Sequence, residues 1–325
     1  MEKSLQNSSA PKLEDLKPIS TDEIVDNSIT DFDLYVKLQQ SVTLYAPSPY
    51  SWNQEELARL KASGYDALYY SNSEQEKVEA YRLVAKLPKI DTQSEPRKRI
   101  LSLTDAGYEL TRILYDYPLD ATTLSKVTEV GHAMIDTIQE DRTCVAALGK
   151  LVNHDYYTYY HSARVAAYAL AIAVQQGLSQ HQRLEELAIG CLLHDIGKSK
   201  VDQKIITKAQ SLNSEEWKIM RKHPEYGDGI VKEAILSSVP RGIILHHHER
   251  MDGSGYPHGL ASRELLPEVK IAAFADTFDA LTTNRPYQNS RTRFEALDLI
   301  RFKLLDGLDR EAFKAMVAIL EKGKV

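Results

Sequence analysis

From about residue 98 onwards, every strong apolar pattern in the chain has helical spacing. Apolar residues recur three and four positions apart, which gives each helix an apolar face that another helix must cover. We therefore expect an all-α helical bundle in this part of the chain. The spacing predicts helices at about 98–116, 121–140, 161–176, 182–195, 214–223, 268–283, 292–305 and 310–322.

The first third of the chain has a different pattern. Residues 31–38 alternate apolar with other side chains, as in a half-buried strand, and residues 41–46 and 67–71 are further strand candidates around a predicted helix. Prolines and clustered charge in residues 86–97 mark a domain boundary. The expected fold class is multidomain α+β, with a small N-terminal α/β domain before the bundle. The expected parts are a disordered tail at 1–28, an α/β domain of unknown function at 29–90, a helical linker region at 98–145 and a helical domain at 146–325.

Composition and charge argue against several classes of protein. No run approaches the roughly 18 apolar residues of a membrane span, and the N-terminus lacks the apolar core of a signal peptide, so we expect a cytoplasmic protein without a membrane partner. Cys144 and Cys191 are the only cysteines, which fits a reducing compartment better than a disulfide framework. The formal net charge of -6 argues against binding to a nucleic-acid polymer, which rests on a basic surface.

Histidines and aspartates are spread over the predicted helical segments. His194 and Asp195 end an apolar helix just before Gly197, but such a pair alone is more often a capping aspartate beside a satisfied buried histidine. Asp276 lies inside the apolar run VKIAAFADTFDAL, where a buried carboxylate needs a metal or another cation as partner. With the histidines of the other segments, the chain has enough ligands for two octahedral metal ions with water positions left open. Those further histidines are His161, His223, His247 and His248.

Four motifs together resemble the HD-GYP family, the branch of HD-domain metal phosphohydrolases that hydrolyses cyclic di-GMP. They are HDIGK, KHPEYG, HHERMDGSGYPHGL and FADTFDALTTNRPY, and they occur in the family's order and spacing between about Asp155 and Tyr287. The resemblance implies that residues 146–325 form an HD-GYP helical catalytic domain with two divalent metal ions, iron or manganese. The implied metal ligands are His161, His194, Asp195, His223, His247, His248 and Asp276, with Asp195 bridging.

The same resemblance implies the residues that contact substrate. Asp195 and Lys198 would be catalytic, with the Lys198 ammonium on a phosphate oxygen. Tyr256 lies in a glycine-rich loop that borders the substrate in the family and is linked to partner docking, and Arg285 matches a phosphate or guanine contact. His246 is interpreted as a loop or outer residue rather than a ligand.

Two positions depart from the family pattern. Gln288 stands where many members carry a basic residue, which weakens one expected phosphate contact. Tyr157 stands one helical turn before His161, where members with three metals carry a glutamate, and a neutral phenol is a poor ligand for a hard cation. We therefore expect two metal ions and mainly the linear product pGpG, with later cleavage to GMP left open.

The implied function is a metal-dependent phosphodiesterase in which a metal-activated bridging water attacks cyclic di-GMP. Two metal ions about 3.5–4 Å apart acidify such a water and offset charge on the phosphate. One alternative is a catalytically weak cyclic di-GMP receptor or adaptor that signals to a protein partner through the GYP loop or the N-terminal domain. Another is a hydrolase of a different cyclic dinucleotide, such as cyclic GMP-AMP.

Overall fold

The computed structural model divides the chain into two compact units. The first comprises Met1–Leu87 and Tyr117–Ser125, and the second comprises Pro88–Asp116 and Lys126–Val325. The structure describes residues 11–38, 41–150, 157–208, 210–232, 234, 236–284 and 290–323.

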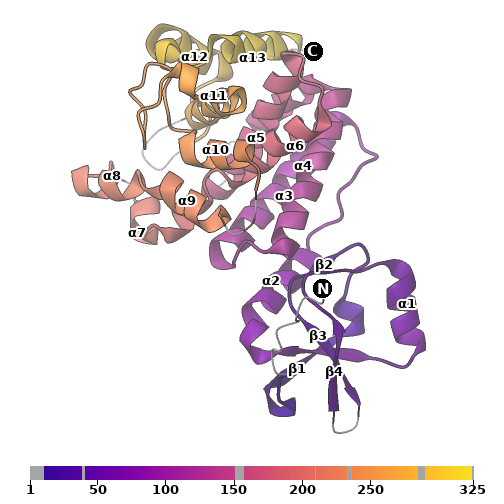
Figure 1. The fold of residues 1–325 in the computed structure, drawn as a ribbon. Coiled ribbons are helices and arrows are strands. Elements are labelled where there is room, and N and C mark those ends of the chain that lie inside the picture. Colours follow the sequence, from indigo (N-terminus) through magenta and orange to yellow (C-terminus); the bar gives the residue numbers. More distant parts are fainter. Residues whose placement is uncertain are drawn as a thin grey trace, which may run out of the picture. The chain divides into compact units, whose positions relative to one another are not determined.

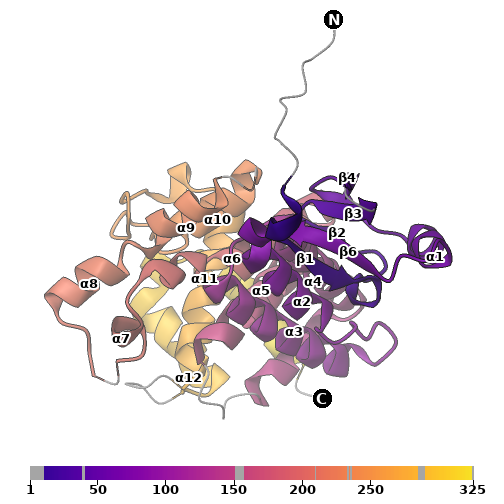
Figure 2. The ribbon, with the colours of Figure 1, turned by 90° about the horizontal axis from the view of Figure 1, so that it is seen from below.

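The first unit contains an antiparallel sheet of four strands in the order β1-β6-β3-β4, of which β6 is labelled in Figure 2 and the other three also in Figure 1. Its core is formed by large apolar and aromatic side chains, including Phe32, Trp52 and Tyr81. Three short 3-10 helices, Leu13–Asp15, Thr21–Glu23 and Asn72–Glu74, lie among the described residues of this unit. The elements are β1 (Leu16–Ser20), β2 (Ile29–Thr30), β3 (Leu34–Leu38), β4 (Ser41–Ala46), β5 (Tyr50–Ser51), α1 (Gln54–Ala62), β6 (Ala67–Ser71) and α2 (Gln75–Ala85).

Two expectations for this region were wrong. The tail predicted at 1–28 contains strand β1, which pairs with β6 from Leu16 opposite Ser71 to Ser20 opposite Ala67. Only Leu16 and Ile19 of this strand are buried, so its sequence lacks the alternation that identifies a strand. The unit is also α+β rather than α/β, because each strand pair among its described residues is antiparallel, and none of the described helices connects parallel strands.

The second unit is helical, and α5 lies in its middle (Figures 1 and 2). Every residue of α5 from His161 to Ala173 is buried, because α3, α6, α11 and α13 pack around it. The small side chains of SARVAAYALAIA allow this close packing on all sides. The helices are α3 (Pro96–Asp116), α4 (Ala121–Glu140), α5 (Tyr157–Gln175), α6 (His181–Leu193), α7 (Gln203–Ile206), α8 (Ser214–Met220), α9 (His223–Val231), α10 (Ser238–His246), α11 (Pro267–Thr282), α12 (Arg293–Leu299) and α13 (Arg310–Lys322).

Each of the eight predicted helices is present, but their ends differ where the chain carries motifs. The helix predicted at 182–195 ends at Leu193, so His194 and Asp195 lie beyond it, and the helix predicted at 292–305 changes into a π-helical turn at Ile300. Helices α9 and α10 had not been predicted. The sequence HPEYGDGIV of α9 has two glycines and few apolar residues, so it shows no apolar stripe. Among the described helices, none combines the length and apolar composition that a membrane crossing requires.

Gly197 allows the turn after α6 to approach α9. A Cβ at this position would lie 1.9 Å from the carbonyl oxygen of His223 and 2.4 Å from the backbone nitrogen of Gly227. Both neighbours are backbone atoms, which cannot move aside as a flexible side chain can. The main effect of Gly197 is therefore to bring the segment after His194 and Asp195 against the helix that begins with His223.

We expect Gly197→Ala to lower the free energy of unfolding by about 1–3 kcal/mol, the usual cost of forcing extra atoms into a packed site. Gly229→Ala on α9 is the matched control, because a Cβ there meets nothing within 4 Å. That control should be neutral or stabilising by up to about 1 kcal/mol, since alanine is the better helix former. Urea unfolding of both variants checks the prediction, and equal stability of the two would contradict it.

Candidate metal centre

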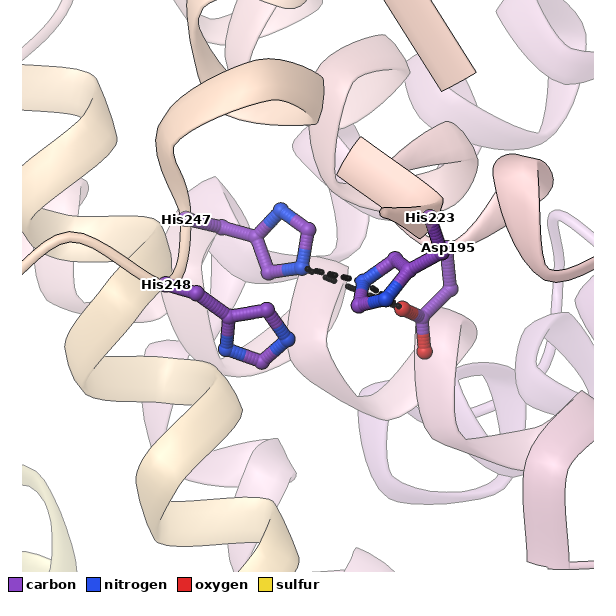
Figure 3. A group of neighbouring side chains, drawn as sticks. All are labelled: Asp195, His223, His247 and His248. Carbon is purple, nitrogen blue, oxygen red and sulfur yellow. Dashed lines mark hydrogen bonds and ion pairs between the residues drawn. The ribbon is translucent and has the colours of Figure 1, made fainter. Parts of the chain in front are cut away.

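Seven predicted ligands come from separate parts of the second unit and meet in one cluster. His161 projects from α5 and Asp276 from α11, while His194 and Asp195 follow the last turn of α6. His223 begins α9, and the pair His247 and His248 follows α10. Figure 3 shows four of them converging: Asp195, His223, His247 and His248.

Asp195 lies at the centre of the cluster and its two carboxylate oxygens face different histidines. Oδ1 is 3.2 Å from Nε2 of His223 and 3.8 Å from Nε2 of His247. Oδ2 is 3.5 Å from Nε2 of His194 and 3.8 Å from Nε2 of His161. The side chain is therefore placed to be shared between two sets of nitrogen ligands.

The cluster forms two overlapping groups that share Asp195. One is His161, His194 and Asp195, and the other is Asp195, His223, His247 and His248; within each group, one ligand atom per residue lies within 4.8 Å of the others. Asp276 lies beside both groups, with Oδ1 3.0 Å from Nε2 of His161 and Oδ2 3.6 Å from Nδ1 of His248. The structure thus brings all seven predicted residues together.

Backbone carbonyls determine the tautomers of three of these histidines. Nδ1–H of His194 donates to the carbonyl of Cys191 at 2.7 Å, that of His223 to the carbonyl of Met220 at 2.8 Å, and that of His247 to the carbonyl of Ile243 at 3.1 Å. A carbonyl oxygen only accepts, so each Nδ1 carries the proton. Each neutral ring therefore presents an unprotonated Nε2 lone pair to the centre of the cluster.

These lone pairs have no proton between them. Nε2 of His223 and Nε2 of His247 lie 3.3 Å apart, and with both protons on Nδ1 they cannot form a hydrogen bond in the neutral state. Nε2 of His194 is buried and has no hydrogen-bond partner. Buried acceptors in this arrangement need a cation, and imidazole with carboxylate is a donor set for divalent transition metals. The residues present therefore fit a metal site.

The electrostatic environment favours the metal-binding protonation states of His247 and Asp195. Burial, together with His194 and His223, holds the pKa of His247 well below its ordinary value. Burial alone would raise the pKa of Asp195, but Lys198 and the neighbouring histidines hold it well below its ordinary value. Neutral imidazoles and ionised carboxylates are the binding forms of these side chains.

Asp279 and Arg164 support the cluster and had not been predicted from the sequence. Nδ1 of His161 lies 2.7 Å from Oδ2 of Asp279, and the Arg164 guanidinium donates to both Asp279 oxygens at 2.6 and 3.0 Å. Burial would raise the pKa of Asp279, but Arg164 and His161 lower it to about 2, so it stays ionised. A signal was present, because Arg164 is three residues after His161 and Asp279 three after Asp276, a spacing that puts each pair on one helical face.

Glu249 was also missed, and it organises the glycine-rich loop. Its fully buried carboxylate accepts backbone N–H bonds from His258, Gly259 and Leu260 at 2.7, 3.1 and 3.1 Å. Gly255 allows the loop to fold back against Glu249, because a Cβ at this position would lie only 2.4 Å from Cα of Glu249. The loop is thereby tied to the segment that carries His247 and His248.

The predicted substrate contacts lie at different places relative to the cluster. Nζ of Lys198 is 2.5 Å from Oδ2 of Asp195, so the lysine is paired with the shared carboxylate. Tyr256 stacks on His248 with ring centroids 4.7 Å apart, and the Arg221 guanidinium carbon lies 5.0 Å from the centroid of the tyrosine ring. His246 contacts His258 at 3.1 Å and is not in either ligand group, as expected.

Three sequence interpretations lie outside what the structure describes. Arg285 and Gln288 are not among the described residues, and the side chain of Tyr157 is likewise not described, although its backbone begins α5.

We expect Arg164→Met to lower the free energy of unfolding by about 3–5 kcal/mol, because it leaves the buried Asp279 carboxylate without its guanidinium. The control is Arg112→Met, which removes an ion pair with Glu109 whose side chains are 49% and 38% exposed. An exposed pair of that kind contributes less than about 1 kcal/mol. Chemical denaturation of the chelator-treated proteins measures the difference, and similar small losses would show that Asp279 does not depend on Arg164.

Comparison with known proteins places this cluster in a family. The sequence profile of the HD domain matches residues 150–311. A cyclic di-GMP phosphodiesterase of Pseudomonas aeruginosa is 36% identical over 173 residues, which are 53% of this chain and 41% of that protein. A 3'3'-cGAMP-specific phosphodiesterase of Vibrio cholerae is also 36% identical over 173 residues, 53% of this chain and 37% of that protein. A cyclic di-GMP phosphodiesterase of Thermotoga maritima is 39% identical over 144 residues, 44% of this chain and 39% of that protein.

The chain therefore spans about two fifths of the length of these relatives. The fold also resembles that of an HDG"Y"P protein from Bdellovibrio bacteriovorus, with a TM-score of 0.61 and 20% identity over 94% of this chain and 100% of that one. From the profile match, the identities and the HDIGK and GYP motifs around the converging histidines, we conclude that residues 150–311 form a domain of the HD family, in its HD-GYP branch.

Proposed function

We propose that the chain is a metal-dependent phosphodiesterase that hydrolyses cyclic di-GMP to linear pGpG. The observation that carries the proposal is the pair of ligand groups sharing Asp195, with unprotonated imidazole nitrogens facing each other across 3.3 Å. Relatives named as cyclic di-GMP phosphodiesterases support the substrate class.

In this proposal, two divalent ions, iron or manganese, occupy the cluster. His161 and His194 would bind one ion, His223, His247 and His248 the other, with Asp195 between the two and Asp276 beside both. Such ions supply Lewis acidity and a water acidic enough to attack phosphorus at neutral pH.

The chain's own residues would bind and orient the phosphodiester. Lys198 is 20% exposed, so its ammonium can turn from Asp195 towards a phosphate oxygen once cations offset the carboxylate charge. The half-buried Tyr256, packed on His248, offers a ring edge and a hydroxyl at the border of the cluster. Arg285 is proposed as a further phosphate or guanine contact, by its position in NRPYQ.

A second substrate, 3'3'-cyclic GMP-AMP, is the competing candidate. The observation that favours it is that a relative specific for this dinucleotide is as similar to the chain as the cyclic di-GMP phosphodiesterase of Pseudomonas aeruginosa, at 36% identity over 173 residues in both cases. The metal ligands would be the same for both substrates, because they act on the phosphodiester and not on the base.

The first test combines metal analysis with product chromatography. We expect purified protein to hold two iron or manganese ions per chain, to convert cyclic di-GMP to pGpG, and to lose activity on chelation. GMP should appear only later, because Tyr157 replaces the glutamate of three-metal members. Parallel time courses with 3'3'-cyclic GMP-AMP serve as the substrate control. Full activity in protein free of transition metal would refute the proposal, and prompt GMP without accumulation of pGpG would refute the two-metal part.

The second test separates the roles of Asp195 and Lys198. Asp195→Asn should abolish turnover and lower metal content, because it removes the charge shared by both ligand groups. Lys198→Ala should keep the metal and lower the rate by about two to three decades, the usual loss for one transition-state contact. Lys200→Ala, an exposed lysine of the same 3-10 turn, is the matched control and should retain activity. Equal activity of the two lysine variants would remove Lys198 from the proposed site and favour a different phosphate contact.

A further inference from the structure

A second group of metal-ligating side chains lies outside the cluster described above. His132 of α4 meets His181 and Glu185 of α6, with one ligand atom of each residue within 4.8 Å of the others. His181 and Glu185 are four residues apart and therefore lie on one face of α6, one turn from each other. None of the three belongs to the motifs that form the proposed catalytic site.

The backbone beside this group is held in place by close packing. A Cβ at Gly131 of α4 would lie 3.2 Å from Cβ of Ala188 of α6, so the two helices approach closely one residue from His132 and three from Glu185. The ligand-bearing positions are thus fixed by a helix contact rather than carried on a loop. Fixed ligand positions reduce the ordering cost of binding an ion.

The side chains themselves are accessible and adjustable. His132 is 42% and Glu185 33% exposed, and His181 is also exposed. Nε2 of His132 lies 2.7 Å from Oε2 of Glu185, and the two imidazole rings have centroids 5.0 Å apart. Ligands of a tetrahedral zinc ion stand roughly 3.3 Å apart, given metal–ligand bonds of about 2.0–2.1 Å. Small rotations of exposed side chains would therefore admit an ion.

The surrounding charges favour a cation. Within the described part of the chain, Glu185 forms an ion pair with His132 alone. Arg183, which lies between His181 and Glu185 in sequence, is paired instead with the buried Glu268. The carboxylate is therefore available to a cation from solution.

We propose that His132, His181 and Glu185 bind one zinc ion, with water completing its coordination. Two imidazoles and one carboxylate form the donor set of zinc sites that keep a position open. His132 binds through Nε2 once its proton moves to Nδ1, an exchange that water allows at an exposed ring. The ion would link α4 to α6, the helix whose C-terminal end leads into His194 and Asp195.

Zinc binding to the full chain tests this site. After removal of metals with a chelator, the protein is equilibrated with a buffered excess of Zn²⁺ and the zinc per chain is counted. The double variant His132→Gln/His181→Gln should bind one zinc fewer than the native chain while keeping its circular dichroism spectrum. Glu185→Gln should need at least a tenfold higher zinc concentration for half occupancy of this site.

Glu186→Gln is the matched control, because it makes the same charge change one position along α6, outside the group. It should bind zinc as the native chain does, and zinc should raise its melting temperature as in the native chain, whereas the zinc-dependent rise should be smaller in Glu185→Gln. The same zinc count in the native chain and the double variant would overturn the proposal. An equal loss of zinc affinity in Glu185→Gln and Glu186→Gln would overturn the proposal as well, because it would show a general effect of charge.

Discussion

The second unit is organised around the buried carboxylate of Asp195. Four imidazole nitrogens lie within 3.8 Å of its two oxygens, and the Lys198 ammonium is paired with it. A carboxylate that is 2% exposed is stable only with such partners, because isolated burial of its charge is costly. The ends of α6 and α10, the start of α9 and the N-terminal part of α5 must therefore all reach one point, and the packing of the bundle has to satisfy that condition.

Backbone groups, more than side chains, set the geometry of this point. Carbonyls at the ends of α6 and α10 orient the rings of His194 and His247, and the absence of a Cβ at Gly197 lets the turn after α6 contact the start of α9. The two carbonyl contacts use backbone atoms that every residue has, and the close approach at Gly197 requires only that this residue is glycine. A chain can keep them while its surface changes widely, provided that the glycine and the helix ends remain.

The residues of the cluster could be predicted from the sequence because all of them except His161 stand in local motifs, such as HDIGK, whose residues are adjacent in the chain. The helices could be predicted where an apolar stripe was long, as in α3, α4 and α13. Strand β1 could not, since its two buried residues do not alternate. Helix α9 could not, because it has few apolar residues and two glycines, of which Gly227 serves close packing. Asp279 and Glu249 were missed for a different reason, because their partners are Arg164, 115 residues away, and loop N–H groups that only the folded chain brings near.

The charge balance of the buried cluster, like the histidine tautomers, indicates that the cluster fits a cation. Among the described residues, the cluster contains three carboxylates, those of Asp195, Asp276 and Asp279. Two cations, Lys198 and Arg164, are paired with them, so one negative charge is left when the histidines are neutral. In a medium of low dielectric constant such an excess is expensive unless a positive charge joins it. Burial would lower the pKa of His161, yet the hydrogen bonds and charges of Asp276 and Asp279 raise it. A bound cation would offset the excess negative charge of the cluster.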